Sequence, residues 1–234
     1  LSYSYFPWRV TKDELTEYFT ELSTPPSVDE FRPSAWPTTP DILPWHLMGA
    51  PLARFAVRAF TAATLCPSWG IYGPAFELGD HTPAGNGKEE YLGSEKYELK
   101  WWDRDRPASL RPLLAELNRI RTEHLALHTL RTLRFHAVDN GELLCFSKTP
   151  HSGPSVAPGA PYASTVLVVA NLDAEHPQGG WVHLDLGALG VDGARPFDVH
   201  DLVSGETYTW HGPDNYVELH PDRQPGHIFR VTQG

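Results

Sequence analysis

The sequence of 234 residues is poor in cysteine and has no long hydrophobic run. Its two cysteines, Cys66 and Cys145, lie in apolar stretches, which is typical of buried thiols in a reducing compartment. No stretch approaches the roughly 18 consecutive apolar residues of a transmembrane helix, and the amino terminus lacks the basic and apolar regions of a signal peptide. We therefore expect a cytoplasmic protein with no membrane partner.

Positive charge is also scarce. The chain carries 19 Lys and Arg residues against 29 Asp and Glu residues, a net charge of −10, and the basic residues form no cluster. Because nucleic-acid binding needs cations that neutralise phosphates, a nucleic-acid partner is not expected. Aromatic residues, in contrast, are plentiful, with eight Trp and nine Tyr. Their faces can stack on sugar rings, although most aromatic side chains fill cores and interfaces.

The first half of the chain alternates between strand and helix patterns. Thr11 and Glu14 are spaced as a capping box, and apolar residues at helical spacing follow them. In the second helical pattern, Arg54 and Arg58 mark a face apart from the apolar one. Such alternation predicts a parallel sheet with crossover helices. The predicted strands cover residues 1–9, the run before Asp41 and residues 69–76, and the predicted helices cover residues 12–22, 52–65 and 110–124.

From residue 130 onward the pattern changes to short β runs separated by turn signals such as Asp139-Asn140-Gly141. Several short strands at roughly ten-residue spacing predict an antiparallel β-sandwich. We therefore expect an α/β part over residues 1–128 and an all-β domain over residues 129–234. The predicted strands cover residues 130–138, 143–148, 165–171, 181–186, 197–202, 206–210, 216–219 and 227–231.

Asp41 is the candidate catalytic residue. A short apolar run breaks at Pro37 and Pro40 and is followed at once by this carboxylate. Proline fixes φ and favours extended geometry before it, so the segment should be a stiff strand exit. Carboxyl ends of parallel strands present ligand-facing residues. The alternative is that Asp41 is the N-cap of the helix that follows.

His124 and His128 are spaced so that two imidazoles could share one helix face and bind a metal. No third ligand lies nearby, and the acid of an H-E-x-x-H motif is missing. We predict no metal site.

Four segments in order carry a resemblance to a known family. The sequence resembles the maltosyltransferases that extend α-1,4-glucan from α-maltose 1-phosphate, a branch of the α-amylase superfamily, over essentially its whole length. Thr38 stands where the family usually has Asn, and Ser34 replaces another frequent Asn. The four segments are residues 2–9, 31–43, 62–72 and 89–100.

The resemblance implies a fold and roles for three residues. The α/β part would be the C-terminal part of a (β/α)₈ barrel, and Asp41 would stabilise the transition state. Residues 79–106 would fold over the cleft beside Asp41, with Lys96 and Tyr97 binding the donor disaccharide. The alternative for this polar segment is a solvated charged loop. Because the chain starts at Leu1, we expect it to be a carboxy-terminal portion, with the nucleophilic Asp and the acid/base Glu upstream.

The implied reaction is a retaining transfer of maltosyl units from α-maltose 1-phosphate to the non-reducing end of an α-1,4-glucan acceptor, with release of phosphate. The resemblance implies a homodimer and no metal or organic cofactor. Two alternatives stay open. One is another enzyme of the superfamily, a hydrolase or a trehalose-forming isomerase, although most amylases have His immediately before the Asp where this chain has Pro40. The other is a glucan-binding fragment without catalysis.

Overall fold

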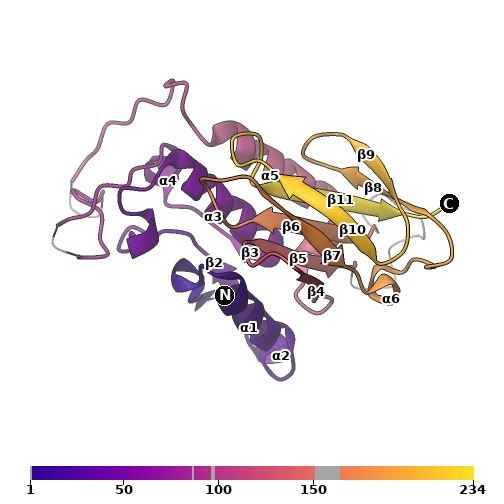
Figure 1. Cartoon of the computed structure of the whole chain (residues 1–234). Coiled ribbons are helices and arrows are strands. Elements are labelled where there is room, and N and C mark those ends of the chain that lie inside the picture. The colour runs from indigo at the N-terminus through magenta and orange to yellow at the C-terminus, as the bar shows by residue number, and fades with distance from the viewer. Residues whose placement is uncertain (1, 86, 96–97, 151–163) are drawn as a thin grey trace.

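The computed structural model describes residues 2–85, 87–95, 98–150 and 164–234. Its strands form a small parallel sheet near the amino terminus and a large antiparallel sheet that takes up most of the second half of the chain (Figure 1). The order of the two parts agrees with the sequence patterns.

The small sheet has the order β1-β2-β3, and both pairs of strands are parallel. Thr11 accepts a hydrogen bond from the Glu14 amide (3.3 Å), and the Glu14 carboxylate accepts one from the Thr11 amide (3.0 Å), so the predicted capping box is confirmed. The elements are β1 (Ser2–Tyr3), η1 (Phe6–Trp8), α1 (Lys12–Ser23), α2 (Ser27–Glu30), β2 (Pro33–Ala35), η2 (Trp45–Leu47), α3 (Leu52–Leu65) and β3 (Ser68–Trp69).

The strand predicted over residues 69–76 is wrong beyond Trp69. Residues Gly73–Glu77 form a short helix, α4. Gly73 has a φ of 36°, and Pro74 occupies the first turn, where its fixed φ and missing N–H favour a helix start. The chain then runs to α5 (Arg111–Glu123) and η3 (Leu125–His128), and the described residues between α4 and α5 form neither helix nor strand.

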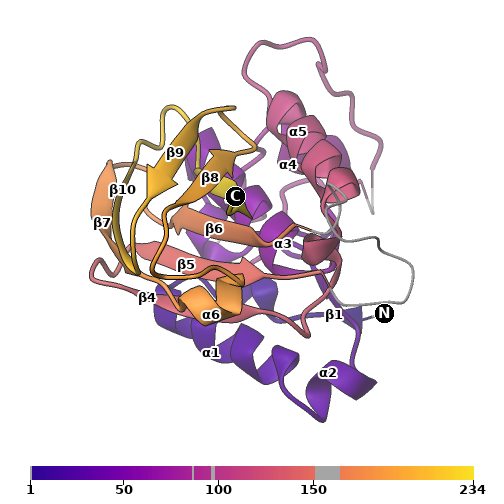
Figure 2. The ribbon, with the colours of Figure 1, turned by 90° about the vertical axis from the view of Figure 1, so that its right-hand side faces the viewer.

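All eight predicted strands of the second half are present, with ends shifted by a few residues. They form one antiparallel sheet of order β10-β7-β4-β5-β6-β11-β8-β9. Side chains from all eight strands meet in one apolar cluster, so the sheet folds over and encloses a core on one face (Figure 2). The elements are β4 (Arg134–Val138), β5 (Leu143–Lys148), β6 (Val166–Asn171), β7 (Gln178–His183), α6 (Leu186–Leu189), β8 (Phe197–Asp201), β9 (Thr207–Trp210), β10 (Asp214–Leu219) and β11 (Gly226–Thr232).

The other face of this sheet packs on the α/β part. Along β5, Leu143 and Cys145 point into the core of the sheet, whereas Leu144 and Phe146 join the cluster that contains Phe60 of α3. Alternate side chains of a strand point to opposite faces, so one strand supplies both cores. The α/β part and the sheet therefore share a continuous hydrophobic core along α3.

Two buried basic side chains donate hydrogen bonds across this contact at the carboxyl end of α3. The last carbonyl groups of a helix have no partner within it. Lys148 of β5 donates to the carbonyl oxygen of Leu65 (2.6 Å), and Arg121 of α5 donates to those of Cys66 (3.1 Å) and Pro67 (2.7 Å). Cations there also interact favourably with the helix dipole.

Burial lowers the pKa of Lys148 from 10.5 to about 7. Between these two pH values the unfolded chain binds the proton more tightly than the folded one, so the free energy of unfolding should rise with pH in this range. The rise is at most about 1.4 kcal/mol per pH unit. We expect Lys148→Met to lack it. Urea unfolding at pH 7.5, 8.5 and 9.5 gives the free energy of unfolding at each pH. An equal rise of this free energy with pH in the two proteins would contradict the prediction.

Candidate active site

Asp41 lies at the tip of a tight turn beyond the carboxyl end of β2. The amide of Thr39 donates to the carbonyl oxygen of Ile42, and the amide of Ile42 donates back to that of Thr39, both at 3.1 Å. Pro40 and Asp41 are thus the two loop residues of the turn. The Asp41 amide also donates to the Thr39 hydroxyl (3.2 Å), and the proline ring fixes φ at its position. The backbone that carries the carboxylate is therefore well defined.

The N-cap interpretation of Asp41 is wrong. The next helical turn, η2, has Pro44 in its N-cap position and no side-chain cap, and α3 has Pro51 in that position. The amide of Leu43 donates to the carbonyl oxygen of Glu89 (3.0 Å). Asp41 is exposed and follows a strand end without capping either helix.

Asp41 lines a cavity of about 460 Å³ at the carboxyl ends of β1 and β2. Its walls are rich in aromatic side chains, which offer flat faces of the kind that stack on sugar rings. Tyr3 and Tyr5 are each 65% exposed, so their rings are accessible to a ligand. The other lining residues are Ser4, Pro7, Trp8, Trp36, Thr39, Pro40 and Ile42.

Glu89 holds one wall of this cavity in place. One carboxylate oxygen accepts from the Trp8 indole N–H (3.0 Å), and the other accepts from the Trp45 amide (2.8 Å). A carboxylate that accepts two N–H groups fixes both more strongly than a neutral acceptor would. Glu89 thereby joins the loop after β1, the segment after Asp41 and residues 79–106.

Arg58 and His46 hold the same wall from beneath. Arg58 is 1% exposed, donates to the carbonyl oxygens of Phe6 (2.6 Å) and Arg9 (2.8 Å), and lies 4.0 Å from the centre of the Phe6 ring. Burial, and then the charge of Arg58, lower the pKa of His46 to about 4. The neutral imidazole therefore donates its Nε2 proton to the Pro7 carbonyl oxygen (2.8 Å).

Trp36 forms another part of the cavity lining. Its indole N–H donates to the Ser34 hydroxyl (3.0 Å), which lies 3.2 Å from the Ser68 hydroxyl on the neighbouring strand. The ring packs edge to face on Tyr3 with centroids 5.4 Å apart. Ser34, which replaces a frequent Asn of the family, therefore orients a cavity wall in this chain.

The segment of residues 79–106 returns to the Asp41 turn. The Ser94 hydroxyl donates to the Pro40 carbonyl oxygen (2.8 Å), and the Glu95 amide donates to the Tyr72 hydroxyl (2.9 Å). The position of Ser94 agrees with the expected fold of this segment over the cleft. Lys96 and Tyr97 lie outside the described residues, so their role at the donor site stays a prediction.

The sequence patterns missed Glu89 and Arg58. Glu89 stands in a polar, charged stretch without periodicity, where nothing marks one acid as a structural acceptor. Arg58 was expected on a separate helix face, yet it is buried, and carbonyl groups of a distant loop accept hydrogen bonds from its Nη1 and Nη2. Only the apolar residues around Arg58 in α3 hinted at its burial.

The two histidines considered as metal ligands have other surroundings. His128 Nε2 bonds to the carbonyl oxygen of Arg121 (2.8 Å), and His124 is 3% exposed. Across the described residues, no group of three or more His, Cys, Asp or Glu side chains could hold a metal ion. Within the same residues, no helix is long and apolar enough to span a membrane.

Solved structures of α-amylases contain a fold similar to that of this chain. The chain is similar to an α-amylase from Geobacillus thermoleovorans, solved with acarbose, with a TM-score of 0.65 and 12% identity over 95% of this chain and 44% of that one. It is equally similar to an Anoxybacillus α-amylase, with a TM-score of 0.65 and 10% identity over 98% of this chain and 45% of that one.

Comparison of sequences shows the family. The family described as "GLGE, C-terminal" matches residues 135–231. Three relatives are named α-1,4-glucan:maltose-1-phosphate maltosyltransferase, and each aligns with 99% of this chain: those of Chlorobaculum tepidum (44% identical), Methylacidiphilum infernorum (42%) and Streptomyces coelicolor (47%, number 2 of that organism). The chain spans about a third of their length, 33 to 34%. By sequence, the chain belongs to the family of the α-1,4-glucan:maltose-1-phosphate maltosyltransferases.

Proposed function

We propose that the protein containing this chain transfers maltosyl units from α-maltose 1-phosphate to the non-reducing end of α-1,4-glucan chains and releases phosphate. The observation that carries the proposal is the position of Asp41, on a rigid turn in an aromatic-walled cavity at the carboxyl ends of parallel strands. The sequence identity to relatives of that name supports the same reaction.

In this proposal, β1, β2 and β3 are the last strands of a (β/α)₈ barrel, whose active sites lie at the carboxyl ends of the strands. Retaining transfer passes through an oxocarbenium-like transition state between a nucleophilic carboxylate and an acid/base carboxyl group. Asp41 would supply a fixed negative charge near the developing positive charge. The nucleophile and the acid/base belong to strands outside this sequence.

The walls of the cavity would position the sugar rings. Trp8 and Trp36 carry rings that Glu89 and Ser34 hold in fixed orientations, so stacking on them costs little conformational freedom. Lys96 and Tyr97 would bind hydroxyl groups of the donor disaccharide. The reaction so written needs neither a metal nor an organic cofactor, because carboxyl groups perform the chemistry and phosphate is the leaving group.

An assay of the complete protein with α-maltose 1-phosphate and maltotetraose separates the alternatives. The proposal predicts phosphate release together with acceptor chains longer by two glucose units. Release of free maltose without longer chains would indicate a hydrolase, and formation of trehalose from maltose would indicate an isomerase. Glucan binding without any of these products would indicate a glucan-binding protein without catalysis.

We also propose that the protein is a cytoplasmic homodimer. Cys66 and Cys145 are both buried and unpaired, which suits a reducing compartment. The homodimer rests on the family resemblance, and analytical ultracentrifugation of the complete protein would test it.

Replacing Glu89 by Gln should weaken substrate binding through the cavity wall. Gln has one acceptor oxygen, and its NH2 group only donates, so Trp8 and the Trp45 amide can no longer both find an acceptor. The hydrogen bond that remains is no longer charge-assisted. We expect KM for α-maltose 1-phosphate to rise about five- to tenfold, the equivalent of about 1 to 1.4 kcal/mol, with kcat within about threefold. Steady-state phosphate release measures both constants.

The matched control is Glu90→Gln at the exposed neighbouring position, which should change neither constant. Equal constants for the two variants would contradict this role of Glu89.

A further inference from the structure

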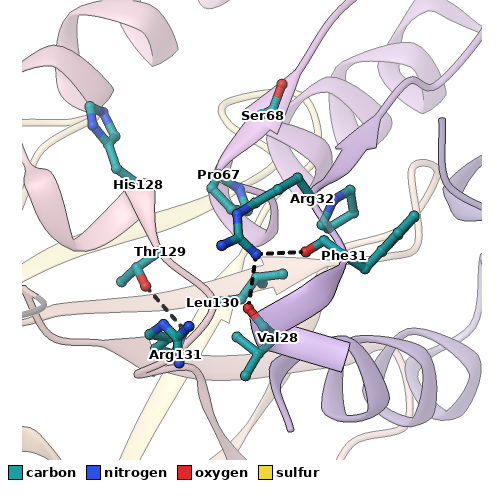
Figure 3. A pocket seen from close by; sticks show the side chains of 10 residues that line it. Val28, Phe31, Arg32, Pro67, Ser68, His128, Thr129, Leu130 and Arg131 are labelled. Atoms are coloured by element: carbon teal, nitrogen blue, oxygen red, sulfur yellow. Dashed lines mark hydrogen bonds between the residues drawn. The ribbon is translucent and has the colours of Figure 1, made fainter. Parts of the chain in front are cut away.

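A second cavity, of about 230 Å³, lies where β2 and β3 begin, whereas Asp41 lies beyond the carboxyl end of β2. Figure 3 shows the side chains that line it. Its walls come from the residues just before β2, the residues around the start of β3, and the stretch from η3 toward β4. It is therefore separate from the candidate active site, which lies beyond the carboxyl ends of β1 and β2. The lining residues are Val28, Phe31, Arg32, Pro33, Pro67, Ser68, His128, Thr129, Leu130 and Arg131.

The lining of this cavity is positively charged, whereas the whole chain is negatively charged. The protein carries a net charge of −10, yet the cavity has two arginines, Arg32 and Arg131, and no carboxylate among its lining residues. The two guanidinium groups come from positions 99 residues apart in the sequence. Apolar side chains such as Phe31 and Leu130 share the lining with these two exposed arginines.

Arg32 has hydrogen-bonding capacity left over. Its Nη1 donates to the carbonyl oxygens of Val28 (3.1 Å), Asp29 (3.2 Å) and Phe31 (3.2 Å), which fixes the position of the guanidinium. Within the described residues, neither Nε nor Nη2 has a hydrogen-bond partner, and Arg32 forms no ion pair. These two donors form the edge of a guanidinium that matches two oxygens of a phosphate.

The other side of the cavity is also held in place. Arg131 pairs with Asp29 (2.6 Å), an exposed contact outside the lining, and its amide donates to the Thr129 hydroxyl (3.1 Å). Figure 3 shows the Arg32 side chain extending between Pro67 and Leu130, with Arg131 and Thr129 below it. The Arg131 guanidinium is thus held by the Asp29 carboxylate, and the two arginines contribute to the lining of one small cavity from different elements.

We propose that this cavity binds a phosphate ion or the phosphoryl group of a small metabolite, with Arg32 as the principal ligand and Arg131 as the second. Phosphate offers oxygens to both guanidinium groups, and at Arg131 it would share or replace the ion pair with Asp29. This site is distinct from the cleft in which the proposed reaction would release phosphate, and it does not depend on that reaction.

Calorimetric titration of the complete protein with inorganic phosphate, at constant ionic strength, tests the proposal. We expect Arg32→Gln and Arg131→Gln each to weaken one binding event about tenfold or more, because each loses a hydrogen bond to a charged group. The control is Arg195→Gln, which removes an exposed guanidinium that pairs with Asp192 in the all-β domain. This variant should bind phosphate within about twofold of the unaltered protein.

Unchanged binding in both arginine variants would overturn the proposal, and so would an equal loss in Arg195→Gln, since that would indicate general attraction to positive charge. If Arg32→Gln lowers the melting temperature by many degrees, Arg131→Gln decides the question, because the Arg131 side chain makes an exposed contact only. Crystals soaked in phosphate should show density between Arg32 and Arg131. A cavity that stays empty at saturating phosphate would also contradict the site.

Discussion

The variant Asp41→Asn of the complete protein should lose maltosyl transfer by about 10²-fold or more and keep its melting temperature nearly unchanged. Asn preserves the size of the side chain and removes its charge. A fixed negative charge near an oxocarbenium-like transition state would then be missing, and a charge-assisted hydrogen bond to a sugar hydroxyl would become a neutral one. Stability should barely change because Asp41 is exposed and caps no helix.

The measurement is phosphate release from α-maltose 1-phosphate with a glucan acceptor, together with a thermal melt. The control is Asp222→Asn, the same change at an exposed turn of the all-β domain, which should leave both quantities unaltered. Near-normal release by Asp41→Asn would remove Asp41 from the catalytic residues. A melting temperature lowered by many degrees would show a structural role instead.

The second large effect is expected from Gly70→Ala. A Cβ atom at this position would overlap the indole ring of Trp36, with only 2.6 Å to its Cε2 atom. The backbone of Gly70 does not lie in the left-handed region, so the clash itself, rather than the lost flexibility, is the cause. Trp36 must then move from its place in the cavity lining.

We expect Gly70→Ala to raise KM for α-maltose 1-phosphate about tenfold and to cost about 1 to 3 kcal/mol of stability, as overpacking commonly does. Kinetics and urea unfolding measure the two effects. Gly141→Ala is the matched control, because a Cβ atom there meets nothing within 4 Å. Identical kinetics for Gly70→Ala and the unaltered protein would show that Trp36 does not shape the binding site.

The sequence patterns predicted regular elements well where local signals agree. The capping box of α1 and the alternating runs of the eight antiparallel strands are such signals. The failure at residues 69–76 came from reading an aromatic run as a strand, although Gly73 and Pro74 favour the helix that forms there.

The site was predictable only in part. Pro37, Pro40 and Asp41 are adjacent in the sequence, so local rules could place a carboxylate at a strand exit. The roles of Glu89 and Arg58 depend on partners 81 and 52 residues away, Trp8 and Phe6 respectively. No periodicity or propensity encodes such long-range hydrogen bonds, because they arise only when the chain has folded.

The contact between the β-sheet and α3 limits which parts of this chain can be moved into another protein. The sequence changes from a mixed to an all-β pattern near residue 129. This change suggests a chimera in which residues 129–234 are joined to a different barrel. Such a graft would carry Lys148 away from the Leu65 carbonyl oxygen that accepts its hydrogen bond, and it would expose Phe146 and the outer face of β6 to water. A transferable module would therefore have to include α3 and Arg121 of α5 together with the β-sheet.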